Sequence, residues 1–411
     1  MNFYPEGNVL CRREDLKGIK TRIASISFRK VFNSHVRLTN EFTIETVDGL
    51  KGTGAAPEGE TISIYEDREC KIEPSEIINK IVNDGICDNE IGQEDFDSYL
   101  DENIAYFGRN NSYALSLAFF NAMYDESSYF DFFSHEKGKL NPPVLCLNIL
   151  NGGWHAYTNP VLSDFHEYLV VPKSNDIEEV IEEHEAIQRL VRERLSGKEK
   201  VIVGGNPVNL LGARDNRVCI EFLKDVLSKL GLDDKYGIMI DASGGDLWKD
   251  DSYRLDITDA KAYSREEFIE YWQSIINDYG LTFLEDPFRE EDYDSWRELT
   301  KSSGDTKLIG DNFYSSDYRR IDSGAREGYT HGVIVKPNQA GTVTSTVKAI
   351  RTAQKHGQIV ISSHRSISTE YTTFLPLVTC MCDVGFIKIG PLYTDYSSVL
   401  RLNEFIRLTE G

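Results

Sequence analysis

The feature that most constrains the fold is a regular alternation of short apolar runs with helical segments. Eight such runs occupy residues 168–172, 200–203, 237–241, 281–286, 307–311, 332–336, 358–362 and 385–390. Between them lie amphipathic stretches such as 176–195, where apolar residues share one face and Asp176 with Glu179 forms a possible capping box. The alternation predicts an α/β fold with a closed β/α barrel. A doubly wound open sheet is the alternative, although no glycine-rich phosphate fingerprint follows the first run.

The N-terminal third has a different pattern. Residues from about 20 to 75 carry the β-branched residues and turns of a small sheet, and the glycine-rich stretch 51–61 predicts an exposed loop. Residues from about 75 to 135 predict helices. Two prolines follow Asn141 and mark a boundary. We therefore expect an α+β capping domain at residues 1–141 and a barrel at 142–411.

Composition excludes several classes of function. The net charge of −22 argues against nucleic-acid binding, because few basic groups are available to neutralise phosphates. An anionic substrate would need a metal ion or a local basic cluster. The seven cysteines form no C-x-x-C pair, which argues for reduced thiols rather than zinc or disulfides. With no apolar signal region and no stretch of membrane-spanning length, we expect a cytoplasmic protein that binds no membrane.

Ionisable residues stand at the ends of six successive runs. They are Asp241, Glu285 with Asp286, Asp311, Lys336, His364 with Arg365, and Lys388. Catalytic groups of a β/α barrel project from the carboxyl ends of its strands. A single charge at such a place is commonly an ordinary surface residue. Ionisable residues at the ends of six successive runs predict that these side chains surround a single active-site opening.

The three carboxylates Asp241, Glu285 and Asp311 predict a site for a hard cation. Oxygen ligands without cysteine and with few histidines favour Mg²⁺ over Zn²⁺. The alternative is that the carboxylates pair with the lysines in a structural ion network, because clustered ionisable groups also occur outside active sites.

The basic residues predict proton abstraction next to a carboxylate. Lys336 or Lys388, close to a divalent cation, suits a general base, and the cation would stabilise the enolate that forms. His364, Arg365 and Ser366 offer a cationic fork and a hydroxyl suited to a phosphate or phosphonate. The alternative is a helix-capping serine beside a surface arginine.

Several motifs resemble those of the enolase family over nearly the whole chain. They are AAPEGETISIYE, FGRNNSYALSLA, NILNGGWHAYTNP, FHEYLVVP, FLEDPFREEDYDSW, LIGDNF, VIVKPNQAGT, SSHRSISTE and FIKIG. The resemblance implies an enolase-type barrel with a small α+β N-terminal domain, usually assembled as a homodimer. It also implies Mg²⁺ and a small anionic phosphorylated or phosphono substrate.

The same resemblance implies roles for individual residues. Lys336 matches the catalytic lysine, and His155 and Glu167 match active-site residues, with His166 in place of the glutamine expected before Glu167. The implied substrate-binding residues are Lys388, His364, Arg365, Ser366 and Thr61, and the Thr61 hydroxyl replaces a serine that contacts a second Mg²⁺.

One departure concerns the second half of the expected reaction. The stretch VGGNPVNLL places Gly205 and Asn206 where enolases have Asp and Glu, and that glutamate is associated with expulsion of the 3-hydroxyl as general acid. An amide cannot donate that proton. His155, His166 or Glu167 could replace it.

Three functions follow from this pattern. The first is an enolase-like lyase that converts a 2-phosphoglycerate-like acid into an enol phosphate. The second is a specialised homologue of phosphonate or phosphinate metabolism, similar to carboxyphosphonoenolpyruvate synthase. The third is a homologue that binds without catalysing.

Overall fold

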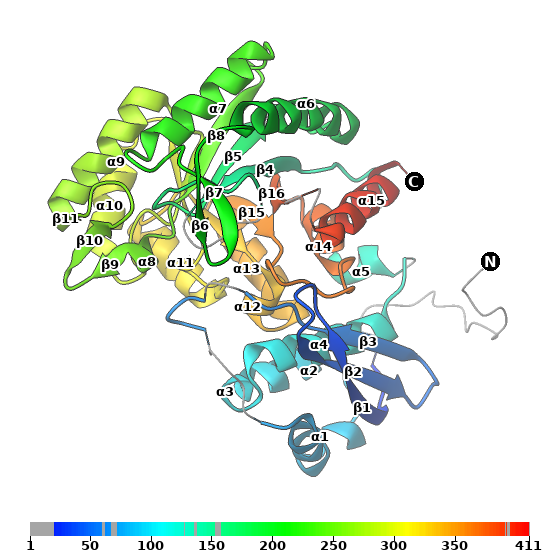
Figure 1. Cartoon of the computed structure of the whole chain (residues 1–411). Coiled ribbons are helices and arrows are strands. Elements are labelled where there is room, and N and C mark those ends of the chain that lie inside the picture. Colours follow the sequence, from blue (N-terminus) through cyan, green and yellow to red (C-terminus); the bar gives the residue numbers. More distant parts are fainter. Residues whose placement is uncertain are drawn as a thin grey trace.

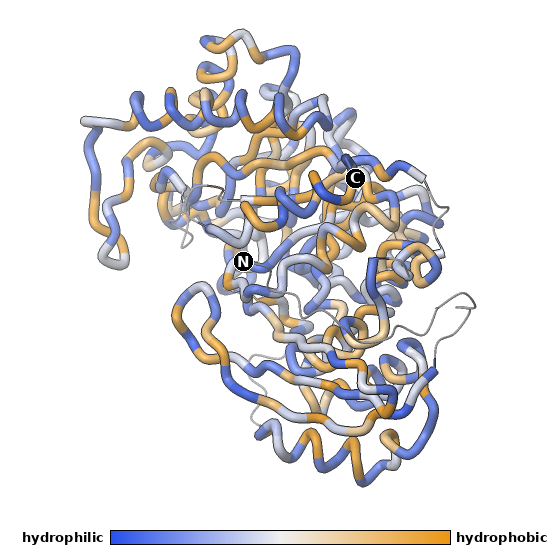
Figure 2. The backbone as a smooth tube through the Cα atoms, turned by 90° about the vertical axis from the view of Figure 1, so that its right-hand side faces the viewer, coloured by the Kyte–Doolittle hydropathy of each residue, from blue (hydrophilic) through white to orange (hydrophobic). Residues whose placement is uncertain are grey.

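The computed structural model describes residues 20–59, 62–66, 72–126, 128–134, 138–152, 158–390, 392 and 395–410. It shows a small N-terminal domain packed against a large barrel (Figure 1). The view turned by 90° shows the same arrangement, with the small domain below the barrel (Figure 2).

The barrel closes in the strand order β12-β13-β14-β15-β16-β4-β5-β8, which confirms the predicted α/β barrel. Its strands are β4 (Val144–Asn151), β5 (Glu167–Pro172), β8 (Tyr236–Asp241), β12 (Phe283–Glu285), β13 (Lys307–Gly310), β14 (Gly332–Val335), β15 (Ile359–Ser363) and β16 (Phe386–Ile389). Every neighbouring pair is parallel except those of β5, which runs antiparallel to both β4 and β8. The amino end of β5 therefore lies at the same mouth as the carboxyl ends of the other strands.

One predicted barrel strand was wrong. The run 200–203 forms β6 (Lys200–Val203), which pairs only with β7 (Asn206–Asn209) in a hairpin outside the barrel. The side chain of Ile202 is 71% exposed there. The eighth barrel strand is β4, which is buried along nearly its whole length and which the sequence pattern had assigned to the domain boundary.

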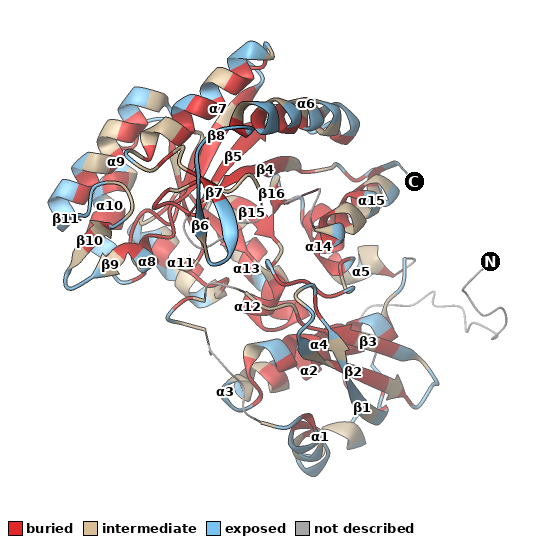
Figure 3. Ribbon diagram, viewed as in Figure 1, coloured by how far each residue is buried: buried red, intermediate tan, exposed pale blue. Residues whose placement is uncertain are grey.

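Apolar side chains fill the barrel below its mouth. Cys146, Leu169, Val171, Met239, Phe283, Ile309, Ile334 and Ile361 form one buried cluster, contributed by seven of the eight strands. The barrel interior is thus a packed core. Figure 3 shows the strands buried and the surrounding helices exposed on their outer sides. The charged side chains of the cavity lie above this apolar cluster, at the mouth of the barrel.

Helices follow the barrel strands along the chain, and most of them cover the outside of the barrel. They are α6 (Ile177–Leu195), α7 (Arg217–Lys229), α8 (Gly244–Leu247), α9 (Arg265–Tyr279), α10 (Tyr293–Ser302), α11 (Tyr318–Glu327), α12 (Pro337–Ala340), α13 (Val343–Lys355), α14 (Phe374–Met381) and α15 (Tyr396–Glu410). At the start of α6 the Asp176 side chain accepts a hydrogen bond from the Glu179 amide at 3.1 Å, which is one of the two bonds of the predicted capping box. A small sheet of β9 (Trp248–Lys249), β10 (Ser252–Leu255) and β11 (Lys261–Tyr263) lies between α8 and α9.

The N-terminal domain packs an antiparallel sheet onto a central helix. Its strands are β1 (Ile23–Phe32), β2 (Leu38–Thr46) and β3 (Lys51–Ala55), and its helices are α1 (Pro74–Asn83), η1 (Ile86–Asp88), α2 (Gln93–Glu102), α3 (Ile104–Phe107), α4 (Arg109–Met123) and α5 (Tyr129–Phe133). A Cβ at Gly52 would lie 2.2 Å from the Ala118 carbonyl oxygen, so β3 and α4 meet backbone to backbone. The predicted exposed loop at 51–61 was wrong for residues 51–55, because these glycines serve close packing.

Direct hydrogen bonds join the two domains. Asp97 of α2 accepts from the Thr344 amide at 2.8 Å, and Arg109 donates to the Gln339 carbonyl at 2.8 Å. The predicted boundary between residues 141 and 142 lies between α5 and β4. Within the described ranges, no helix combines the length and apolar character needed to cross a membrane.

Candidate active site

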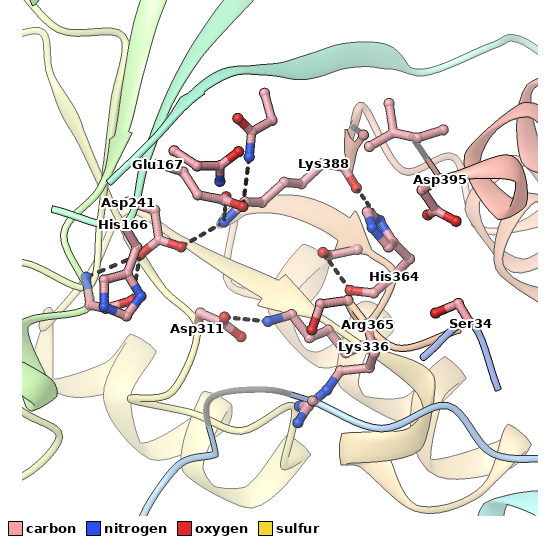
Figure 4. Close-up of a pocket in the computed structure, with 18 of the residues that line it drawn as sticks. Ser34, His166, Glu167, Asp241, Asp311, Lys336, His364, Arg365, Lys388 and Asp395 are labelled. Carbon is pink, nitrogen blue, oxygen red and sulfur yellow. Dashed lines mark hydrogen bonds and ion pairs between the residues drawn. The ribbon is translucent and has the colours of Figure 1, made fainter. Parts of the chain in front are cut away.

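Nine of the predicted site residues line one cavity at the barrel mouth (Figure 4). They are His166, Glu167, Asp241, Asp311, Lys336, His364, Arg365, Ser366 and Lys388. Glu167 lies opposite Asp241 in the register of β5 and β8, and Asp241 lies opposite Glu285 in the register of β8 and β12. Neighbouring strands therefore bring these carboxylates together.

Lys388 forms the centre of a buried charge cluster. Its Nζ lies 2.7 Å from a carboxylate oxygen of Glu167, of Asp241 and of Glu285. Burial would lower the pKa of Lys388, but Asp241, Glu167 and Glu285 outweigh it and raise the pKa well above its ordinary value. Lys388 is accordingly a protonated counter-ion in this geometry.

The carboxylates of this cluster differ in the direction of their pKa shifts. Burial and the nearby charge of Asp241 raise the pKa of Glu285 well above its usual range. Burial would also raise the pKa of Asp241, but the charges of Lys388 and His166 lower it below the ordinary value. Because two close carboxylates disfavour a shared negative charge, the pKa values of Asp241 and Glu285 move in opposite directions.

Lys336 has a single carboxylate partner. It follows β14, is 14% exposed at its side chain and forms an ion pair with Asp311. The Ser316 hydroxyl accepts a hydrogen bond from the Lys336 amide at 2.8 Å, which fixes the backbone. Lys336 thus reaches the cavity from the strand end that the sequence predicts.

The donor set of Asp241, Glu285 and Asp311 fits a divalent cation. All three supply oxygen, and Glu285 Oε1 and Asp311 Oδ1 are buried without a hydrogen-bond partner. In the described part of the chain, however, no three acidic, histidine or cysteine side chains stand ready to enclose a metal ion. The ammonium groups of Lys388 and Lys336 hold the positive charge there, so a cation would have to displace them from the carboxylates.

A second group of residues forms the basic end of the cavity. Arg365 is 4% exposed and lines the cavity, and its Nη1 lies 3.1 Å from Glu66 Oε2 of the N-terminal domain. Burial lowers the pKa of His364 to about 3, so that its ring is neutral, and Nδ1 lies 3.3 Å from the Lys388 carbonyl oxygen. Arg365 is thus the cation that faces an incoming anion at this end.

His166 and Glu167 stand side by side at the start of β5. The His166 amide donates to the Asp241 carbonyl at 3.0 Å, and its Nε2 lies 3.3 Å from Asp246 Oδ2. Asn148 donates to Glu167 Oε1 at 2.7 Å. Both side chains are therefore oriented by polar neighbours toward the cavity.

Comparison with known proteins decides the family. The model of the enolase C-terminal TIM barrel domain matches residues 139–411. The enolase of Sulfolobus acidocaldarius is 30% identical over 388 residues, which cover 90% of this chain and 91% of that protein. The chain belongs to the enolase family. An enolase of Ehrlichia ruminantium (strain Gardel) is 28% identical over 401 residues, covering 90% of this chain and 92% of the relative.

The departure of this chain from the family pattern lies outside the cavity. Gly204 and Gly205 have φ values of 55° and 87° and turn the hairpin between β6 and β7. Asn206 follows on the exposed side of that hairpin and does not line the cavity. The position where the family resemblance implies an acid therefore lies outside this cavity.

Sequence reasoning missed several residues of the cavity. Asn148 lies within the NILNGG motif quoted above, so its signal was present. Ser34, His35 and Gly59 enter from the N-terminal domain, and Asp395 precedes α15. Gly59 lies within the AAPEGETISIYE motif quoted above, whereas no local pattern marks Ser34, His35 or Asp395. His155 and Thr61, both predicted as site residues, lie outside the described residues.

Proposed function

We propose that this chain is a Mg²⁺-dependent lyase that removes the proton α to the carboxylate of a 2-phosphoglycerate-like acid and forms an enol phosphate. The similar proteins named enolase support the reaction class. The observation that carries the proposal is the cluster of ion pairs that Lys336 and Lys388 form with Asp311, Asp241 and Glu285 at the mouth of the barrel.

Lys336 is the proposed base. It has one carboxylate partner, whereas Lys388 is surrounded by three, so Lys336 can exchange a proton at lower electrostatic cost. Lys388 would instead hold the substrate carboxylate. A proton taken by Lys336 Nζ would leave the substrate as an enolate.

Asp241, Glu285 and Asp311 are the proposed Mg²⁺ ligands. Bound Mg²⁺ would stabilise the negative charge that develops on the substrate carboxylate. The Arg365 guanidinium would bind the phosphate or phosphonate at the other end of the cavity, with His364 and Ser366 beside it. The substrate would thus be held at both ends.

The proton for the departing hydroxide needs a donor other than Asn206. We assign it to His166, which lines the cavity and lies beside the Asp246 carboxylate. Asp246 would orient the ring in the manner of a carboxylate that fixes a histidine. Glu167, with Asn148 as its partner, is the second candidate, and His155 is the third.

A second function, the specialised phosphonate-type homologue, is favoured by the position of Asn206 outside the cavity. An altered leaving group would need no acid at that position. The third function, binding without catalysis, has no feature of the described cavity that favours it over the other two.

We also propose a homodimer in the cytoplasm. Phe28, Phe32, Val36 and Leu38 expose between 41% and 77% of their surface along β1, the turn after it and the start of β2, and they form an apolar patch suited to a second copy. The free cysteines of the described residues agree with a reducing compartment. Light scattering at micromolar concentration tests the dimer, and a monomer would overturn it.

The decisive experiment separates the two halves of the reaction. The full chain with Mg²⁺ and 2-phosphoglycerate is followed by ultraviolet absorbance of the enol product, and C2 exchange is followed in deuterium oxide. Product formation supports the enolase-like lyase, and exchange without product supports the altered homologue. Absence of both leaves the binding role.

Lys336→Ala should abolish C2 exchange while Mg²⁺ binding, measured by calorimetry, is retained. Asp311 loses only its lysine partner in this variant and keeps its carboxylate for the cation. The matched control is Lys301→Ala on the exposed end of α10, which should change neither quantity. Exchange that persists in Lys336→Ala would exclude Lys336 as the base.

A further inference from the structure

A short segment of the N-terminal domain is tied across the barrel mouth. The Ser63 hydroxyl donates to the Asn312 carbonyl at 2.9 Å, and the Ile64 amide donates to Glu290 Oε1 at 3.2 Å. Ser63 is 2% exposed. Because Asn312 follows the predicted metal ligand Asp311, residues 62–66 (the strap) lie directly beside the site.

The strap ends in a carboxylate that reaches the basic end of the cavity. Glu66 Oε2 lies 3.1 Å from Arg365 Nη1, and Gln339 Nε2 donates to Glu66 Oε1 at 3.0 Å. The side chains of Glu66 and Arg365 are 8% and 4% exposed. Burial would raise the pKa of Glu66, but Arg365 and Gln339 outweigh it and lower the pKa, so the carboxylate is charged.

The backbone around Arg365 restricts where its guanidinium can go. Glu58 and Ile367 exchange backbone hydrogen bonds of 2.8 and 3.1 Å, which hold the two segments side by side. A Cβ at Gly59 would lie 1.6 Å from Arg365 Nη2, so the guanidinium lies directly against the Gly59 backbone. We therefore expect an anion to bind the Arg365 guanidinium in the position that it has here.

A buried guanidinium needs a negative partner. Removing one member of a buried ion pair costs several kcal/mol, because the remaining charge has lost both water and partner. Glu66 supplies that partner when the cavity holds no anion. A phosphate beside Arg365 would supply it equally well, and the two anions would repel each other at that distance.

We propose that Glu66 is an internal counter-ion that occupies the anion subsite at Arg365 and that the anionic group of the substrate takes its place. The proposal deepens the proposed function, since it rests on Arg365 as the receiver of a phosphate or phosphonate. Glu66 thereby sets the affinity of the subsite for anions. Anion binding would also break the ion pair between Glu66 and Arg365, and it would thereby weaken the attachment of the strap to the barrel.

Calorimetric titration of the full-length protein with inorganic phosphate tests the exchange. Glu66→Gln keeps the size of the side chain and removes its charge, so phosphate should bind about tenfold more tightly than to the wild type. Glu66→Asp keeps the charge on a shorter side chain and should give an intermediate affinity. Unchanged or weaker binding in Glu66→Gln would overturn the proposal, because Glu66 would then only support Arg365.

Two further variants separate the charge of Glu66 from loosening of the strap. Glu290→Gln weakens the other anchor of the strap without touching Arg365, and it should leave phosphate affinity within about twofold of the wild type. Tightening as large as that in Glu66→Gln would contradict the proposal. In an Arg365→Ala background, Glu66→Gln should produce no tightening, and tightening there would also contradict it.

The outcome is independent of whether the chain turns over 2-phosphoglycerate. Loss of C2 exchange with the predicted phosphate series intact would reject the proposed reaction alone. Normal exchange with the same phosphate affinity in wild type and Glu66→Gln would reject the counter-ion role alone. Absence of phosphate binding in both proteins would reject the anion subsite itself. Thermal unfolding of each variant shows that it is folded.

Discussion

At the scale of single residues, Gly59 gives a direct test of how Arg365 is placed. In Gly59→Ala the new methyl group would overlap Arg365 Nη2, and the flexible tip of the arginine would move rather than the backbone. Phosphate affinity should fall about tenfold, or roughly 1.4 kcal/mol, with little change in the melting temperature. Isothermal calorimetry measures the first and differential scanning calorimetry the second.

Gly385→Ala is the matched control for that substitution. A Cβ at Gly385 would meet no atom within 4 Å, so phosphate affinity should be unchanged. Equal affinity in Gly59→Ala and the wild type would show that Arg365 tolerates displacement and that its contact with Gly59 does not place it.

His166 can be tested by separating proton abstraction from dehydration. His166→Gln keeps a polar side chain of similar reach but cannot act as an acid, so product formation should fall by about 10²–10⁴. Exchange at C2 should continue, because Lys336 is untouched. Parallel assays of absorbance and deuterium exchange check this, and equal losses of both would assign His166 to binding instead.

Local patterns predicted the residues at strand ends better than those brought in from another domain. Asp241 and Lys336 follow apolar runs, so their place at the mouth follows from the barrel alone. Glu66 ends the motif AAPEGETISIYE, but nothing in that motif pairs it with Arg365, and only the packing of the two domains brings the two side chains together. Its position depends on contacts distant in sequence.

At the scale of secondary-structure elements, short apolar runs were ambiguous. The run 200–203 and strand β4 are both apolar, but β4 packs between β16 and β5 while β6 lies on the surface. The antiparallel direction of β5 could not be predicted from the sequence, because no local pattern gives the direction of a strand. Glu167 was assigned to the site through the family resemblance, and the direction of β5 explains why it lies at the mouth.

The β6–β7 hairpin carries a prediction of its own. Asn206→Glu restores the residue type found in enolases, yet the hairpin holds position 206 at the surface and outside the cavity. Formation of enol product should therefore be the same as in the wild type within about twofold. The rate of absorbance change with 2-phosphoglycerate measures it. A large increase would mean that the hairpin reaches the mouth when substrate binds.

At the scale of the whole molecule, the site belongs to both domains. The barrel supplies the acidic residues and lysines, while the N-terminal domain supplies Glu66, Gly59, Ser34 and His35. The contacts of Asp97 with Thr344 and of Arg109 with Gln339 hold the two domains in this relation. The sequence predicts a capping domain. Which of its residues reach the cavity depends on how the domain packs against the barrel, and the sequence does not show this.

Two buried titratable groups that do not line the cavity should make opposite contributions to stability between pH 4 and 6. Burial raises the pKa of Asp97 from 3.8 to about 6, so its stabilising contribution is full below pH 3.8 and is lost as pH rises through 6. Burial lowers the pKa of His184 from 6.5 to about 4, so its contribution is full above pH 6.5 and is lost as pH falls through 4. Each contribution is roughly 3 kcal/mol, and in the wild type they nearly cancel.

Single substitutions should expose each contribution. Between pH 4 and 6, the free energy of unfolding of Asp97→Asn should rise by roughly 2 kcal/mol relative to the wild-type change, and that of His184→Gln should fall by a similar amount. Urea titrations at the two pH values measure these changes. Each variant is compared between pH 4 and pH 6, so that any pH-independent effect of its substitution on the free energy of unfolding cancels. Other titrating groups cancel against the wild type. Variant curves that run parallel to the wild type would show that neither group titrates differently in the folded and unfolded chains.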